Sequence, residues 1–95
     1  MGDRLAEARP PWRVVWTREA ERYFHRVQPK TQARILKALQ TLAVDPLGSS
    51  HVKRLHGELE GLHRFRLGDL RMVFRLLPLD REIRIIAIAS RGDVY

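Results

Sequence analysis

The chain has 95 residues, no cysteine, 44% hydrophobic residues and a formal net charge of +7. This length fits one domain with a small core, and the missing cysteines exclude a disulfide framework or a thiolate metal site. No apolar run approaches the roughly 20 residues of a membrane span, and the first eleven residues lack the apolar region of a signal peptide. We therefore expect a cytoplasmic protein.

The basic residues are mostly arginine, with 15 arginines against 3 lysines. Arginine binds phosphate through paired donors and stacks on bases. The excess positive charge indicates a polyanionic partner, which is a nucleic acid, a membrane surface or an acidic protein. A compositional bias of the source organism is the alternative explanation for the overall charge.

The first half of the chain predicts one strand and two helices. Residues 1–11 are expected to form a loose tail, and residues 12–16, "WRVVW", have the β-branched and aromatic content of a strand. Thr17 is the expected N-cap of a helix over 18–27, and Pro29 separates it from a second helix over 30–43. Apolar residues recur at helical spacing along that second helix, at Ile35, Leu36, Leu39, Leu42 and Ala43.

The second half predicts three strands joined by hairpins. After a loop over 44–50 and an irregular stretch with room for a short strand, "RFRLGDLRMVF" (64–74) predicts a hairpin with a two-residue turn at Gly68 and Asp69. "IRIIAIAS" (83–90) has apolar residues on both faces and predicts a central strand. The predicted fold class is α+β, with the order β-α-α-β-β-β and an antiparallel sheet covered on one face by the N-terminal helical hairpin.

The hairpin turn places three arginines on one face of the sheet. The two-residue turn puts Arg66 opposite Arg71 and Arg64 opposite Val73. Because side chains alternate between faces, Arg64, Arg66 and Arg71 share one face. The other face, which the helices should cover, carries Phe65, Leu67, Leu70, Met72 and Phe74. Like charges that stand directly opposite are destabilising, and a bound phosphate would relieve that repulsion. The pattern therefore predicts an anion site.

A solvated surface is the alternative for these arginines, since charged strands prevent aggregation between sheet edges. Asp69, in the turn, is placed to neutralise one of them in part. At the end of the chain, Arg91 is placed to join the cluster, and Tyr95 offers a ring for stacking and a phenol for proton transfer. This set fits single-stranded RNA, which proteins bind through stacking and basic contacts.

Other polar and aromatic residues are assigned structural roles. The histidines, His25, His51, His56 and His63, lack the spacing of a metal site. His63 is expected on the same face as Phe65, near its edge. Trp12 and Trp16 are expected to pack in the core or at the edge of the sheet.

The stretch "KRLHGELEGLHRFRLGDLRMVFRL" and the ending "SRGDVY", on this order of elements, resemble the RelE/ParE superfamily of bacterial and archaeal toxins, most closely its RelE branch. The resemblance covers residues 12–95. It implies a ribosome-dependent endoribonuclease that cuts mRNA in the A site. In that reaction the 2′-hydroxyl attacks the adjacent phosphate, and neither a metal nor a cofactor takes part.

The resemblance also implies the residues that carry the reaction. The catalytic residues are Arg66, Arg71, Arg91 and Tyr95, and the RNA-binding residues are Arg64, Lys53 and Arg54. Arg71 and Arg91 would stabilise the phosphate, and Tyr95 would orient the nucleotide. The best-known RelE pattern has lysine at 64 and 66, and arginine stays protonated. Arg66 is therefore a poor general base, which leaves Tyr95 or electrostatics and strain supplied by the ribosome.

The implied partners are mRNA on the ribosome, with contacts to ribosomal RNA, and a cognate antitoxin. The toxin–antitoxin pair is expected to bind operator DNA. Two alternatives remain on the same fold, a ParE-like protein that inhibits DNA gyrase by binding and a catalytically impaired RelE homologue. Fold alone does not separate them.

Overall fold

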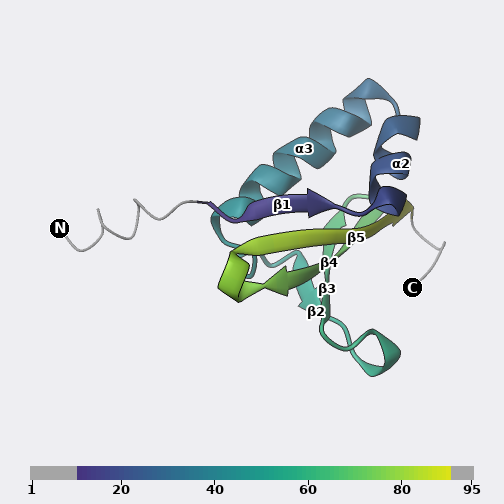
Figure 1. Ribbon diagram of the computed structural model, residues 1–95. Helices are drawn as coiled ribbons and strands as arrows, with labels where there is room; N and C mark the ends of the chain where they lie inside the picture. The colour runs from purple at the N-terminus through teal and green to yellow at the C-terminus, as the bar shows by residue number, and fades with distance from the viewer. Residues whose placement is uncertain (1–10, 91–95) are drawn as a thin grey trace.

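The computed structural model describes residues 11–90, which form one layer of two helices packed on one sheet (Figure 1). The predicted α+β class is confirmed. The elements in chain order are β1 (Arg13–Trp16), α2 (Arg18–Arg26), α3 (Pro29–Val44), β2 (Val52–Arg54), the 3₁₀ turn η1 (Gly57–Leu59), β3 (Leu62–Leu67), β4 (Leu70–Leu77), the 3₁₀ turn η2 (Pro78–Asp80) and β5 (Glu82–Ser90).

The five strands form one mixed sheet in the order β1-β5-β4-β3-β2. β3, β4 and β5 pair antiparallel through their hairpins, as predicted, and β5 is an interior strand. One feature was not predicted, the parallel pairing of β1 with β5. The irregular stretch, where the sequence left room for a short strand, contains β2, a paired edge strand of 3 residues. β1 is the other edge and has 4 residues. Both edges of the sheet are therefore short.

The predicted register of the β3–β4 hairpin is confirmed at each paired position. Leu67 pairs with Leu70, Arg66 with Arg71, Phe65 with Met72 and Arg64 with Val73. The turn depends on Gly68, whose φ of 59° lies in the left-handed region that glycine adopts without strain. A Cβ at Gly68 would lie 2.6 Å from Arg34 Nη2, so the exposed end of the Arg34 side chain would have to move aside.

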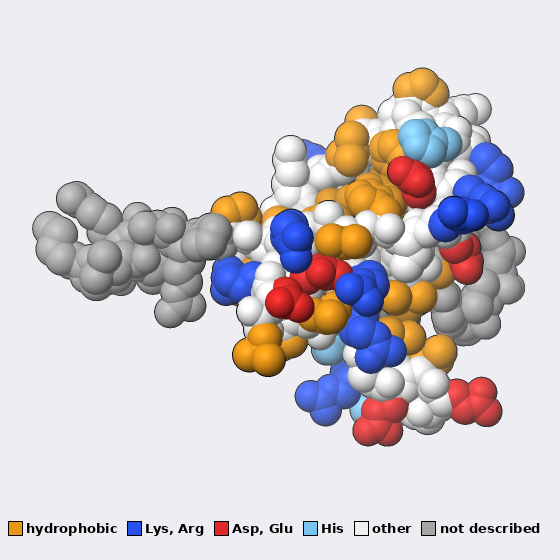
Figure 2. Space-filling view, viewed as in Figure 1, with side chains coloured by type: hydrophobic (Ala, Val, Ile, Leu, Met, Phe, Trp, Pro, Cys, Tyr) orange, Lys and Arg blue, Asp and Glu red, His pale blue; other side chains and the backbone are white. Residues whose placement is uncertain are grey.

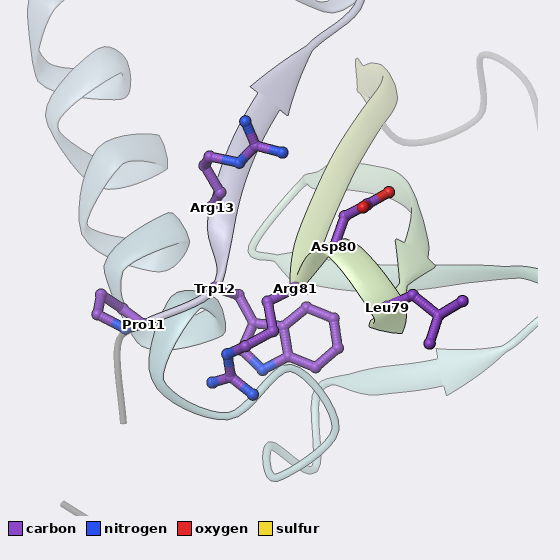
Figure 3. A pocket seen from close by; sticks show the side chains of 6 residues that line it. All are labelled: Pro11, Trp12, Arg13, Leu79, Asp80 and Arg81. Carbon is purple, nitrogen blue, oxygen red and sulfur yellow. The ribbon is translucent and has the colours of Figure 1, made fainter. Parts of the chain in front are cut away.

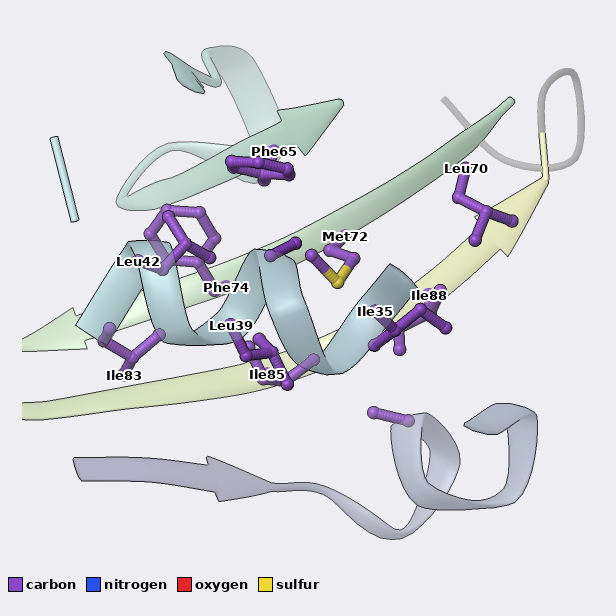
Figure 4. Close-up of a cluster of buried hydrophobic side chains, with 12 residues drawn as sticks. Ile35, Leu39, Leu42, Phe65, Leu70, Met72, Phe74, Ile83, Ile85 and Ile88 are labelled. Carbon is purple, nitrogen blue, oxygen red and sulfur yellow. The ribbon is translucent and has the colours of Figure 1, made fainter. Parts of the chain in front are cut away.

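The core lies between α3 and one face of the sheet (Figure 4). All five residues predicted for the helix-covered face of the hairpin reach it; four are buried, and Leu67 is partly buried at its edge. On α3, Leu36 is 47% exposed, whereas Ala38 is buried. At 100° per residue, Leu36 lies beside the stripe of Ile35, Ala38, Leu39 and Leu42 rather than on it. Trp12 and Trp16 pack against the core margin, as predicted.

Thr17 joins the start of α2 to an irregularity in β5. Its hydroxyl oxygen accepts a hydrogen bond from Ala20 N at 3.3 Å, which confirms the predicted N-cap. The hydroxyl also donates to the carbonyl of Ile86 at 2.8 Å. Ile86 is the extra residue of a β-bulge, because Val73 pairs with Ala87 while the next residue, Phe74, pairs with Ile85. Thr17 thus supplies the partner that the bulge denies to this carbonyl.

Replacing Thr17 by valine is expected to lower the free energy of unfolding by about 1–3 kcal/mol. The loss combines a helix cap with a partly buried carbonyl left unpaired. Urea denaturation followed by circular dichroism measures the change. Thr41→Val is the matched control, since its exposed hydroxyl bonds only to the Lys37 carbonyl within α3. Equal losses in the two variants would contradict the role of Thr17.

Candidate nucleic-acid interface

The face of the sheet turned away from the helices, here called the open face, carries a continuous group of cations. Lys53 of β2 pairs with Arg64 of β3, and Arg66 of β3 pairs with Arg71 of β4. Arg64 and Arg71 are diagonal neighbours, a relation that separates backbone positions by about 7–8 Å in a sheet. The sheet thus brings together the three hairpin arginines and one of the two basic residues predicted on β2.

Small side chains occupy the middle of the open face. Val73, Ala87 and Ala89 are buried there, although neither helix of residues 11–90 covers this side. Arg64 stands opposite Val73, and Arg71 stands opposite Ala89. Arginine stems pack well over apolar surface while the charged ends stay accessible. The arginine stems can therefore pack over these small residues. The sheet beneath them holds side chains more closely than a loop does.

Two of these arginines hold donors that lack a partner. Arg64 Nε and Arg71 Nη1 are buried from solvent and make no hydrogen bond within residues 11–90. A buried donor without a partner costs about 1–3 kcal/mol, and more when it is charged. An oxyanion placed between the two guanidinium groups would accept from both of them. These unsatisfied donors favour an anion on the open face, which would have to displace the atoms that now cover them.

Nothing in the described structure neutralises the opposed pair of Arg66 and Arg71. No ion pair joins Asp69 to an arginine among residues 11–90, so the neutralisation considered for the turn is absent there. Repulsion between directly opposite charges costs up to about 1 kcal/mol relative to a neutral pair. This cost favours an anion site over a surface that serves only solubility.

Arg54 and His63 lie on the other face. Arg54 pairs with His63 in the β2–β3 ladder, so by alternation both point away from Arg64. The His63 ring stacks on Phe74, with centroids 5.5 Å apart, which confirms its predicted face. Burial lowers the pKa of His63 below its usual 6.5, and the charge of Arg54 lowers it further. Of the predicted RNA-binding residues, Arg54 is the one that the sheet separates from the cluster.

Sequence reasoning missed a second charged group on the open face. Glu82 is buried and bonds to Arg84 and to Arg13, at 2.7 Å and 3.3 Å. Arg75 pairs with Arg84 across β4 and β5. Simple alternation along β5 puts Arg84 on the face opposite to Ala87, and only the bulge at Ile86 brings both to one side. The β5 sequence alone gives no signal for that bulge.

Arg91 and Tyr95 lie outside the described residues, so their predicted roles are not tested here. The last described residue of β5 is Ser90, which pairs with Leu70, the neighbour of Arg71. Strand β5 therefore ends at the turn end of the hairpin, where Arg66 and Arg71 stand.

Two hollows lie elsewhere on the described surface. One, of about 540 Å³, is lined by Trp12, Arg81 and Leu79, and Arg81 stacks over the Trp12 ring at 5.0 Å (Figure 3). The other, of about 370 Å³, lies between α3 and the margin of the sheet near Phe65. Neither includes an arginine of the hairpin cluster.

The described residues offer no alternative site of two common kinds. No three histidine or acidic side chains between residues 11 and 90 gather in a way that could hold a metal ion. Neither helix in that range is long and apolar enough to cross a membrane.

Replacing Arg66 by glutamine is expected to raise the free energy of unfolding by about 0.2–1 kcal/mol at low ionic strength, since it removes the opposed charge. The gain should shrink in 1 M NaCl, which screens exposed charges. Arg66→Lys, which keeps the charge, is the control. Urea denaturation at the two salt concentrations gives the values, and a loss of stability in Arg66→Gln would contradict the repulsion.

The stability of the protein is expected to fall as the pH drops below 6.5, in part because of His63. Its pKa is lowered in the folded state, so the unfolded chain binds the proton first and gains stability as the pH falls. His63→Gln should remove this part of the decline between pH 7.5 and 5. Thermal melting across that range tests it, with His56→Gln, an exposed site, as control. Parallel declines in wild type and His63→Gln would refute it.

Comparison with known structures gives relatives that share this fold. A chain of the toxin–antitoxin complex RelBE2 from Mycobacterium tuberculosis is 28% identical, with a TM-score of 0.77 over 88% of this chain and 95% of that one. A chain of the archaeal RelE–RelB complex from Pyrococcus horikoshii is 25% identical, with a TM-score of 0.75 over 88% of this chain and 99% of that one. The intact RelBE complex of E. coli has a chain at 12% identity and a TM-score of 0.72, over 87% of this chain and 99% of that one, a likeness of fold alone.

Sequence comparison with family models gives one assignment. A search of curated proteins found no match. The model that describes the ParE toxin of the type II toxin–antitoxin system parDE matches residues 14–95, which is most of the chain. The expected membership of the RelE/ParE superfamily is confirmed, whereas the family model bears the name of its ParE branch. The protein therefore belongs to the ParE toxin family of the RelE/ParE superfamily, the toxins of type II toxin–antitoxin systems.

Proposed function

We propose that this toxin is an endoribonuclease that cuts mRNA in the A site of the ribosome. The observation that carries the proposal is the pair of donors Arg64 Nε and Arg71 Nη1, which make no hydrogen bond and have no acidic strand partner within residues 11–90. A phosphate between them would gain two charged donors. Extra negative charge on that phosphate, as develops during its transfer, would gain more than the ground state.

In the proposed reaction the 2′-hydroxyl of one nucleotide attacks the adjacent phosphate and displaces the 5′-oxygen of the next. Arg71 and Arg91 stabilise the phosphate oxygens, and Arg91 also assists the leaving oxygen. Arg64 and Lys53 hold the RNA backbone. Arg66 stays protonated, so it stabilises charge and does not accept the proton. Tyr95 orients the nucleotide by stacking.

Residues 64 and 66 are arginine rather than lysine, and arginine stays protonated, so another group must accept the proton of the 2′-hydroxyl. One candidate is the phenol of Tyr95, and the other is solvent, with the ribosome supplying strain. The two differ in their pH dependence, because a tyrosinate becomes common only near pH 10. A cleavage rate that rises with pH in wild type but not in Tyr95→Phe would assign the role to Tyr95.

The cognate antitoxin is proposed to neutralise the toxin by covering the open face with an acidic segment. The solved relatives that share this fold are described as toxin–antitoxin complexes. Carboxylates would satisfy the same donors as a phosphate, so the antitoxin and RNA would compete. The pair is further proposed to bind its operator DNA.

Gyrase inhibition is the second candidate function, and the matching family model favours it because that model is named for ParE toxins. A ParE-like inhibitor would bind gyrase without cutting RNA. It would not need an arginine aimed at a scissile phosphate. Inhibition of supercoiling by the purified toxin, with intact mRNA, would select this function.

The deciding experiment is primer extension on mRNA bound to programmed ribosomes, with free mRNA as a control. We expect cuts within the A-site codon that are absent without ribosomes. Arg71→Ala should lower the rate about 100- to 1,000-fold, the usual cost of removing one donor to a transition state. Arg22→Ala, an exposed site on α2, should leave it unchanged. No cleavage by folded wild-type protein would reject the nuclease.

A further inference from the structure

The open face carries a second arginine pair at the other end of the β4–β5 ladder. Arg75 and Arg84 stand directly opposite each other, as Arg66 and Arg71 do across β3 and β4. Arg75 is exposed, and the side chain of Arg84 is 43% exposed. Two pairs of like charges on one face, each with its own repulsion, are unusual for a surface that serves stability alone.

The bulge in β5 is what aligns the second pair with the first. Arg71, Val73 and Arg75 follow regular alternation along β4 and so share the open face. On β5 the extra residue Ile86 shifts the alternation once, and Arg84 therefore faces the same side as Ala87. If β5 alternated regularly through Ile86 instead, Arg84 would face the core side.

A buried carboxylate positions Arg84. Glu82 Oε2 accepts a hydrogen bond from Arg84 Nε at 2.8 Å and forms an ion pair with Arg84 Nη2 at 2.7 Å, and Oε1 accepts from Arg13 Nη2 at 3.3 Å. This fixes one edge of the Arg84 guanidinium and leaves its other donors outward. Figure 2 shows Lys and Arg side chains over the β1–β5 side of the sheet, with acidic side chains beside some of them.

The charge at this end is not balanced. Glu82 offsets one of its two arginine partners, and Arg75 makes no ion pair within residues 11–90. The Arg75 guanidinium lies beside Gly61, where a Cβ would be only 3.5 Å from Nη1. Arg75 is therefore an exposed, uncompensated cation next to an oriented one.

We propose that Arg75 and Arg84 form a second phosphate-binding position, which holds the backbone of the same RNA strand away from the reacting phosphate. The inference rests on the proposed function, because it extends the proposed RNA-binding surface, here called the track, to a second phosphate of the same strand. Arg71 and Arg75 are four residues apart on β4, about 13 Å at the usual strand rise. That distance separates two different phosphates of one strand. Backbone contacts of this kind hold and orient RNA without reading its sequence.

The test is the salt dependence of binding to a single-stranded RNA oligonucleotide whose sugars are all 2′-O-methyl. This probe cannot be cut through its 2′-oxygen, so binding is measured apart from cleavage. Each phosphate contact contributes about 0.7 to the slope of log affinity against log salt for a single strand. Arg75→Gln should lower the slope by about that amount, and Arg75→Lys should restore it. Arg22→Gln on α2, with the same charge change, should leave the slope near that of wild type.

Equal slopes for Arg75→Gln and Arg22→Gln, or no measurable binding by wild type, would overturn the second position. Circular dichroism of each variant confirms that folding is retained. The two proposals can fail separately. Binding that depends on Arg75, from a protein that cuts no mRNA on ribosomes, would reject the reaction and support the track. Normal cleavage on ribosomes, together with a salt slope that Arg75→Gln does not change, would support the reaction and reject the track.

Discussion

The pleat of the sheet decides which side chains meet the helices and which meet solvent. On β3 and β4 the alternation is strict, so Phe65, Met72 and Phe74 enter the core while Arg64, Arg66 and Arg71 face away. A slip of one residue would bury three arginines and expose the aromatic core. The burial of their neighbours thus holds the arginines in place, while the opposed charges of Arg66 and Arg71 lower the stability of the fold.

On β5 a bulge interrupts this alternation, and the hydroxyl of Thr17 bonds to the bulged residue. The bulge at Ile86 leaves a carbonyl unpaired, and Thr17 satisfies it while capping α2. The helix start, the bulge and the facing of Arg84 are therefore one linked feature. Thr17, far from the arginines in sequence, thus contacts the bulge that turns Arg84 to the open face.

The sequence predicted local features well and distant ones poorly. The turn at Gly68 and the alternation around it were enough to place every residue of the hairpin, and Thr17 was identified as a cap by its side chain. The parallel pairing of β1 with β5 joins segments about 70 residues apart in the register, a contact that local patterns do not encode. The bulge at Ile86 was not predicted either, because local patterns do not encode it. The ion pairs of Glu82 with Arg13 and Arg84 were missed with it. Arg91 and Tyr95 were assigned from their place after the last strand and from the family resemblance, and both lie outside the described residues.

Both edges of this sheet are short, with 4 residues in β1 and 3 in β2. A free edge is a template on which another chain can add a strand, and the risk grows with the length of unpaired backbone. Lys53 and Arg54 make up two of the three residues of β2, and their charges repel a second copy of the same edge. A short edge that carries two positive charges therefore disfavours the addition of a strand from a second copy of the chain.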